Sequence, residues 1–234
     1  MSTLAPELPA GGGETIADDL AGMGSFFVDP SGAARRVFHK WFWVGPLVLF
    51  SVVSLVVAYI LAPMTLRVME SMGLNERQVQ VAETMQHVTM WFAPVSAAVI
   101  YAIEALILFG VASVMSVSAS FRSMFNLVAG CSLIQMLAAI AGVVIVKMRG
   151  EVATMADMRP ALGIDIFLPE GTNKFLLAFV GYFSIFEIWW IVMMVLVLSR
   201  AFRISAGKAF AIVLPLVLVG VLFRVIVAAF GRGA

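Results

Sequence analysis

Two glutamates lie deep inside apolar stretches of this chain, where a charged side chain is uncommon. Glu104 is 13 residues into the stretch 91–115, and Glu187 is 13 residues into the stretch 174–198. A carboxylate that is charged and unpaired at the middle of a bilayer costs roughly several kcal/mol, so it is paired, protonated or used for function. These two side chains are therefore the first candidates for chemistry.

Two other polar side chains are expected near the same depth. Gln135 lies ten residues into a third apolar stretch, and Arg224 lies six residues from the outer end of the last one. If successive helices alternate in direction, Glu104, Gln135 and Glu187 form one intramembrane polar layer. Arg224 is nearer the outer face, where its guanidinium either reaches outward or turns inward to a glutamate.

The polar layer has two interpretations. In the functional one, it is a site linked to protons or cations, or a polar pocket for a lipid headgroup or small substrate. In the structural one, a protonated glutamate donates hydrogen bonds between helices, each worth on the order of 1 kcal/mol. The structural interpretation is favoured, because a five-helix chain lacks the inverted repeats of common transporters.

Patterns typical of enzymes and metalloproteins are missing from the sequence. The chain has one cysteine, Cys131, and two histidines, His39 and His87, which are too few for a Cys/His metal site. It contains no Walker A sequence, no HExxH and no glycine-rich nucleotide loop. We therefore expect a protein that is not an enzyme, with no catalytic residues, no metal and no cofactor.

Composition decides the class of protein. The chain is 62% hydrophobic and only 12% charged, whereas soluble domains are about 25% charged. Its apolar stretches are each long enough to cross a hydrocarbon core about 30 Å thick. They cover residues 42–62, 91–115, 125–146, 174–198 and 208–230. The sequence therefore predicts an all-α polytopic membrane protein, a bundle of five transmembrane helices.

The part of the chain before the first span differs from the rest. Residues 1–25 are acidic and rich in Pro, Gly, Ser, Thr and Ala, which predicts a disordered tail. Residues 26–41 are predicted to form an interfacial amphipathic segment, with Asp29 as N-cap and Pro30 as first helical residue. Residues 42–230 then form the membrane domain.

Three basic residues mark the amphipathic segment. Arg35, Arg36 and Lys40 lie in the same segment as several aromatic side chains, which suits a short helix lying among lipid headgroups. The simpler interpretation is a positive flank that only orients the first span.

Basic residues near the ends of the spans predict the orientation. With the N-terminus inside, the inside and outside segments carry seven Lys and Arg residues each, so the bare count decides nothing. The rule applies best to short loops and flanks, and the two short inside loops hold basic residues without acids. We therefore predict a multi-pass protein of the inner (plasma) membrane, with a cytoplasmic N-terminus and an outside C-terminus.

Three stretches carry a family resemblance. They are FFVDPSGAARRVF (26–38), SFRSMFNLVAGCSLIQ (120–135) and FVGYFSIFEIWWIVMMVLVLSRAFRISAGKAFAIVL (179–214). On these, over about residues 26–230, the chain resembles the Yip1 domain family in its bacterial branch. The resemblance implies five spans and brings no catalytic residue. The eukaryotic Asp-Leu-Tyr-Gly-Pro signature is absent, so the trafficking role of eukaryotic relatives is not expected here.

These observations lead to three functional hypotheses. The first is a non-enzymatic scaffold or accessory subunit of a larger membrane complex, such as one associated with an exporter or with membrane organisation. The second is a small transporter or channel that uses the midplane glutamates. The third is a lipid-binding or membrane-shaping protein. The expected partners are membrane lipids and either further copies of the chain or a larger membrane complex, and no nucleic acid.

Overall fold

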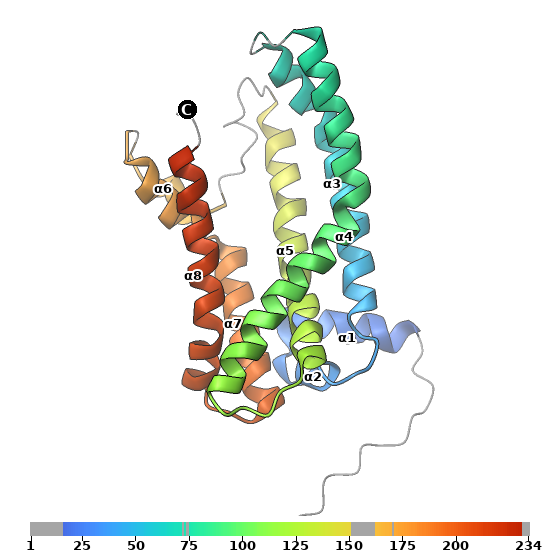
Figure 1. The fold of residues 1–234 in the computed structure, drawn as a ribbon, viewed down its shortest axis with the longest axis vertical. Coiled ribbons are helices and arrows are strands. Elements are labelled where there is room, and N and C mark those ends of the chain that lie inside the picture. The colour runs from blue at the N-terminus through green and yellow to red at the C-terminus, as the bar shows by residue number, and fades with distance from the viewer. Residues whose placement is uncertain (1–15, 72, 74, 151–161, 170, 231–234) are drawn as a thin grey trace, which may run out of the picture.

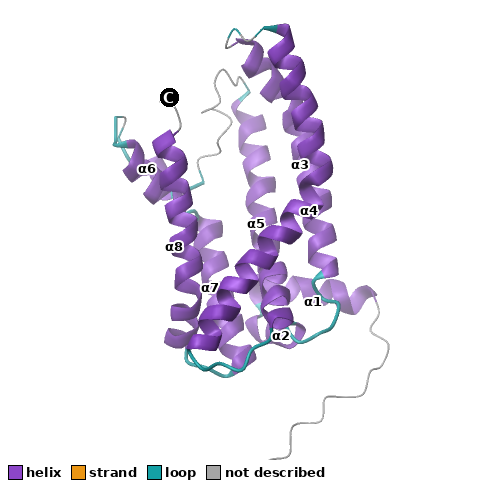
Figure 2. Ribbon diagram, viewed as in Figure 1, coloured by secondary structure: helices purple, strands orange, loops and turns teal. Residues whose placement is uncertain are grey.

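The computed structural model describes residues 16–71, 73, 75–150, 162–169 and 171–230 (Figure 1). Its helices are α1 (Ile16–Val28), α2 (Pro30–Arg36), α3 (Val44–Ser71), α4 (Glu76–Val114), α5 (Phe121–Arg149), the short 3-10 helix η1 (Ile164–Phe167), α6 (Lys174–Tyr182), α7 (Ile185–Phe202) and α8 (Ala206–Phe230). Figure 2 shows these helices joined by loops, with no extended sheet in the described part. Five of them are long and apolar enough to cross a membrane, which confirms an all-α polytopic membrane protein.

Side-chain caps explain where several helices begin. The Asp29 carboxylate accepts a hydrogen bond from the Ser31 N–H at 3.0 Å, and Pro30 follows it as predicted. Asn75 and Gln78 form a reciprocal capping box at the start of α4, with distances of 2.9 and 3.0 Å. These caps satisfy N–H groups that the first turn of a helix leaves without partners.

Helix α4 is much longer than its predicted span. It runs unbroken for 39 residues, so the polar segment that precedes the span belongs to the same helix. At 1.5 Å per residue it measures about 58 Å, which exceeds a bilayer of about 45 Å including headgroups. Helix α4 is therefore long enough to cross a bilayer and to extend beyond one of its surfaces.

The N-terminal tail is less disordered than predicted. Helix α1 begins at Ile16, so the prediction of disorder is wrong for residues 16–25. Residues 1–15 lie outside the described part of the chain. The sequence of α1 places Leu20, Met23 and Phe27 at helical spacing, and this pattern is the local signal for the helix.

The predicted fourth span, 174–198, is not one helix. It is interrupted at Phe183 and Ser184, which separate α6 from α7. Helix α6 packs against α8 and η1, whereas α7 packs against α5, α2 and α8. The run is apolar throughout, and hydrophobicity alone does not distinguish one helix from two.

The bundle is packed at one end and open at the other (Figure 1). The basal half contains the α4–α5 and α7–α8 turns, and the open half contains the α3–α4 loop and α6. The buried core lies in the basal half, where its largest side chains include Leu108, Leu127, Met194, Leu198 and Ile212. In the open half, α8 with α6 stands apart from α3 and α4.

A collar made of α1, α2 and the turn 37–43 lies across the basal end (Figure 1). Phe26, Ala33 and Val37 are fully buried in it, so much of the predicted amphipathic segment packs against protein. Phe38 and Trp41 are 50% and 60% exposed. The position of the collar at a lipid interface stays a prediction.

Candidate functional site

The helix break places Glu187 at a helix terminus rather than in mid-helix. The Ser184 hydroxyl accepts a hydrogen bond from the Glu187 N–H at 3.1 Å and so caps α7. Ser184 also forms an isolated backbone bridge with Gly163. A carboxylate in the first turn of a helix is favoured by the helix dipole. The signal for this start is present in the sequence as Ser184-x-x-Glu187, the spacing of a capping box.

Two members of the predicted polar layer are in direct contact. The Gln135 side-chain amide donates a hydrogen bond to the Glu187 carboxylate at 2.8 Å, which joins α5 to α7. Glu104 on α4 is half-buried and near enough for its carboxylate to interact electrostatically with that of Glu187. No hydrogen bond to Glu104 is present among the described residues. The structure thus brings three helices together at this layer.

Arg224 belongs to a separate contact next to the layer. Its guanidinium donates a hydrogen bond to the Gly181 carbonyl, near the C-terminal end of α6. It also lies over the Tyr182 ring, 5.9 Å from the centroid. Within the described residues, no ion pair joins it to Glu104 or Glu187. Of the two predicted placements, the arginine therefore turns toward protein, but to a helix terminus rather than to a glutamate.

Tyr182 connects the Arg224 contact to the polar layer. Its hydroxyl is near enough to interact electrostatically with the Glu187 carboxylate. The ring is seated against Gly220 on α8, where an added Cβ atom would lie 2.7 Å from the Tyr182 hydroxyl oxygen. A glycine is therefore required at 220 for α6 and α8 to approach this closely.

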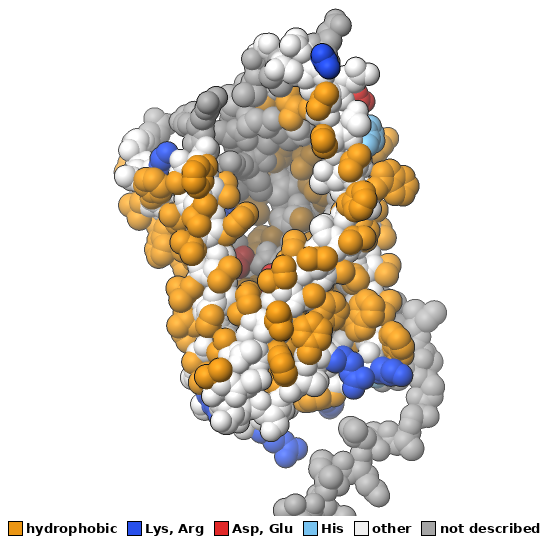
Figure 3. All heavy atoms as spheres, in the orientation of Figure 1, with side chains coloured by type: hydrophobic (Ala, Val, Ile, Leu, Met, Phe, Trp, Pro, Cys, Tyr) orange, Lys and Arg blue, Asp and Glu red, His pale blue; other side chains and the backbone are white. Residues whose placement is uncertain are grey.

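A hollow opens above the layer. Figure 3 shows it between the side chains of α4 and those of α8, with acidic side chains at its floor. Irregular backbone at membrane depth is tolerated where it is buried in protein or lines a cavity. The break between α6 and α7 meets this condition, because the backbone bridge from Gly163 and the Arg224 guanidinium cover its polar groups.

The predicted basic residues lie in the collar, apart from the polar layer. The Arg36 side chain lies against Gly22 of α1, and Lys40 sits over the Trp41 ring at 5.4 Å. Arg35 is exposed. Figure 3 shows basic side chains gathered at this end of the molecule.

Asp29 is an acidic residue of the collar that feels the charges of nearby arginines. The pKa of its carboxyl is lowered, chiefly because it accepts a hydrogen bond from the Gly32 N–H. The Ser31 N–H and the charges of Arg35 and Arg200 act in the same direction. Each of these favours the ionised carboxylate.

Asn126 is a functional candidate that the sequence analysis did not single out. It is fully buried on α5, and its amide donates to the carbonyls of Val37 and His39 at 2.9 and 2.7 Å. Its side-chain oxygen accepts a hydrogen bond from the Trp43 N–H at 3.2 Å. Asn126 therefore fixes the turn 37–43 on the bundle. The sequence signal for this role is an amide side chain at the start of an apolar span, where a polar group is uncommon.

Within the described ranges, no three His, Cys, Asp or Glu side chains gather closely enough to hold a metal ion. The polar layer is thus best described as a carboxylate–amide contact under a hollow, flanked by an arginine-capped helix end. Such a group can exchange a proton, accept hydrogen bonds from a ligand, or hold helices in register.

Comparison with known proteins gives one match. The Yip1 domain family model matches residues 23–227, which is most of the chain. No curated protein and no solved structure matches it.

Proposed function

Because the chain belongs to the Yip1 domain family, we propose that it is a non-enzymatic scaffold or accessory subunit of a membrane complex, formed with itself or with other membrane proteins. The observation that carries this proposal is the shallow burial of its outer helices. Only 11% of the most apolar part of α3 and 22% of that of α8 are buried within the chain. These lateral faces are available to helices of another subunit as well as to lipid.

The chemistry of the faces supports the same role. One face of α3 is exposed along several turns. The exposed fractions of its side chains are 56% for Val48, 51% for Val52 and 52% for Val56. Leu218 and Leu222 are each 57% exposed on α8. Helices associate in membranes through close packing of apolar side chains, and these two faces are free of charged groups over several turns.

Photo-crosslinking from these faces tests the scaffold role. A photoreactive side chain at Val52 or at Leu218 should give protein adducts in native membranes, and the same group at the fully buried Val128 should give none. Adducts with lipid alone would argue against the proposal. So would a stable monomer that purifies without a partner and carries out transport.

We also propose an inner-membrane location with a cytoplasmic basal end. The collar and the two basal turns carry Arg35, Arg36, Lys40, Arg122, Arg200, Arg203 and Lys208, which fits the positive-inside rule. A cysteine introduced at Ser205 should be shielded from a membrane-impermeant maleimide in intact cells, and one at Glu83 should react. The native Cys131 is fully buried and gives little background. The reverse pattern would invert the orientation.

A second candidate function is a small transporter or channel. It is favoured by the helix break beside Glu187, because interrupted helices at membrane depth are where transporters bind substrates and coupling ions. Glu104→Gln and Glu187→Gln should each abolish flux in proteoliposomes, with Glu83→Gln as the matched control outside the layer. Flux that is absent, or unchanged in both variants, removes the basis for this candidate.

A further inference from the structure

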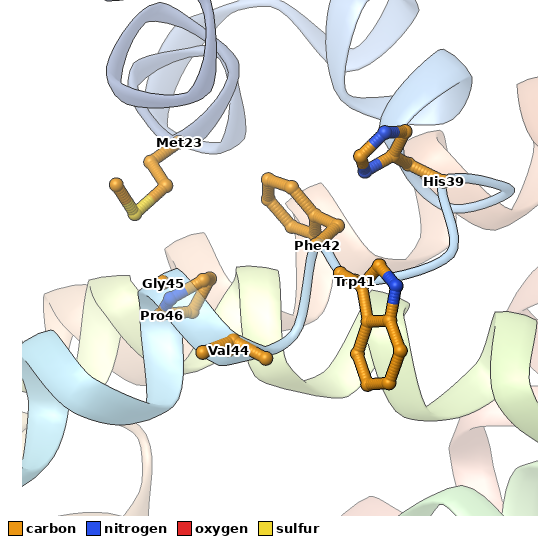
Figure 4. A pocket seen from close by; sticks show the side chains of 7 residues that line it. All are labelled: Met23, His39, Trp41, Phe42, Val44, Gly45 and Pro46. Carbon is orange, nitrogen blue, oxygen red and sulfur yellow. The ribbon is translucent and has the colours of Figure 1, made fainter. Parts of the chain in front are cut away.

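A cavity lies between the collar and the start of the first span. It has a volume of about 390 Å³ and is lined by Met23 of α1, by His39, Trp41 and Phe42 of the turn, and by Val44 and Pro46 of α3 (Figure 4). Small-molecule sites in proteins have volumes of about 300 to 1,000 Å³ and are lined mainly by apolar and aromatic side chains with few polar groups. The size and lining of this cavity match that description.

The walls of the cavity are held in place by the rest of the bundle. The Phe42 ring stacks on the buried Phe26 ring with centroids 5.2 Å apart. Asn126 holds the backbone of the turn through Val37, His39 and Trp43. The site is therefore preformed, so a ligand would not have to order it on binding.

One glycine keeps the cavity open. Gly45 lies in the first turn of α3, and an added Cβ atom would be 3.2 Å from the Met23 sulfur and 3.4 Å from its terminal methyl. A larger side chain at position 45 would therefore project toward Met23 and into the cavity. By contrast, Gly24, which follows Met23 on α1, has nothing within 4 Å of an added Cβ atom.

The chemistry of the cavity changes from one side to the other. Figure 4 shows Met23, Val44 and Pro46 on one side of Phe42, with the nitrogen-bearing rings of His39 and Trp41 on the other. The exposed ammonium of Lys40 sits over the Trp41 ring at 5.4 Å. An apolar compartment beside a cation fits an amphiphile with a hydrocarbon chain and an anionic head.

The place of the cavity identifies the source of such an amphiphile. It is walled by the first residues of a membrane-spanning helix, and tryptophans with basic residues at such positions lie at headgroup level. Anionic phospholipids of the bilayer present their phosphates at this level.

We propose that this cavity binds one anionic phospholipid from the surrounding bilayer, with an acyl chain among Met23, Phe42 and Pro46 and the phosphate beside Lys40 and Trp41. The site is distinct from the polar layer and does not depend on the scaffold role. In this proposal the collar contributes to the recognition of an anionic lipid.

Native mass spectrometry of the full chain in mild detergent tests the proposal. The protein is titrated with dioleoyl phosphatidylglycerol, with dioleoyl phosphatidylcholine and with glycerol phosphate. We expect one saturable site for phosphatidylglycerol. Gly45→Leu should weaken it about tenfold, and the matched variant Gly24→Leu should change it less than about twofold, because only the first fills the cavity.

The headgroup is tested with a second pair of variants. Lys40→Gln should lower the preference for phosphatidylglycerol over phosphatidylcholine about fivefold, the factor expected for one lysine near an anionic surface. Lys208→Gln, at the same end of the bundle, should leave the preference unchanged. This pair keeps the proposal testable if Gly45→Leu fails to fold.

Several results would overturn the proposal. Equal weakening by Gly45→Leu and Gly24→Leu would show that the cavity is not occupied by a chain. Competition by glycerol phosphate as strong as that of the intact lipid would show a site for the phosphate alone. Failure of the wild-type chain to bind phosphatidylglycerol would show that the cavity is not a site for an anionic phospholipid.

Discussion

The third span passes through both halves of the bundle, and its surroundings differ between them. Twelve buried residues of α5 lie between Ser123 and Met136 in the basal half, and only three lie between Gly142 and Val146 in the open half. All five buried residues of α8 likewise precede Gly220. The same apolar composition thus gives a closed core at one end and separated helices at the other.

The difference lies in what joins the helices. In the basal half, long-range hydrogen bonds from Asn126 and from the Trp189 indole N–H, which donates to the Phe27 carbonyl at 3.0 Å, add to dense packing. In the open half, α6 is joined to α8 by the hydrogen bond from Arg224 to the Gly181 carbonyl and by the contact of Arg224 with the Tyr182 ring. Buried packing is concentrated in the first region, and polar contacts around a helix break lie in the second.

Loss of the Asn126 contacts should have the largest effect on stability. Asn126→Leu keeps the approximate volume but leaves two carbonyls and one N–H of the turn without their partner. We expect a loss of roughly 3 kcal/mol or more in the free energy of unfolding, because each unpaired buried group costs about 1–3 kcal/mol. Denaturant unfolding in detergent measures it. A loss below 1 kcal/mol would mean that the collar is not fastened by this residue.

Gly130→Ala should come next, because it acts on the packing of the same half. An added Cβ atom at 130 overlaps the ring of Phe26, which is fully buried. Overpacking of this kind costs roughly 1–3 kcal/mol. Gly110→Ala is the control, since nothing lies within 4 Å of its added Cβ atom. Equal thermal midpoints for the two variants would contradict the close contact of α1 with α5.

Gln135→Leu examines the boundary between the halves. It removes the donor to Glu187, a hydrogen bond expected to contribute about 1 kcal/mol between membrane helices. Unfolding measurements beside those of Asn126→Leu give the comparison directly. A loss as large as that of Asn126→Leu would erase the distinction between a fastened basal half and an adaptable layer.

Gly220→Ala repeats the glycine test in the open half. Its added Cβ atom would lie 2.8 Å from the nearest carbon of the Tyr182 ring, so close that one of the two must shift. We expect less than about 1 kcal/mol of destabilisation, because α6 can move away from α8 where a buried core cannot. The movement should appear as faster maleimide labelling of Leu176→Cys. Unchanged labelling would show that α6 is held as firmly as the collar.

The smallest effect is expected at the exposed N-cap Asp29. Its pKa is lowered in the folded state, so the ionised form stabilises the fold above the ordinary carboxyl pKa near 4. This stabilisation is lost as the pH falls through the lowered pKa. Asp29→Asn should therefore reduce the thermal midpoint slightly at pH 7, and the difference from the wild type should vanish in acid. A difference that persists in acid would assign the effect to capping geometry alone.

Local signals in the sequence predicted the local structure well. Five membrane-spanning helices and the Asp29 cap were confirmed, with the fourth span at Ile185–Phe202 rather than 174–198, because each depends on residues within a few positions of one another. The resemblance to the Yip1 domain family was confirmed over residues 23–227. These features need no knowledge of the tertiary fold.

Features that depend on distant partners were not predictable. The contacts that cover the break at Ser184, and those of Asn126, involve Gly163, Gly181 and the turn 37–43, which only the fold brings together. Of the predicted polar layer, the structure shows a direct contact between Gln135 and Glu187, and the layer as a site stays a prediction. The sequence does not decide which group Arg224 contacts, because its partner is the C-terminal end of α6, which the apolar run does not reveal. The functional roles of these residues stay predictions.

The contacts of Asn126 also have a consequence for biogenesis. Trp43 precedes Asn126 by 83 residues, so two spans must be synthesised and inserted before the turn at 37–43 meets its partner. Throughout that interval the nascent chain carries an unfastened collar with aromatic side chains exposed. The third span therefore supplies the polar partner that fastens the turn before the first span.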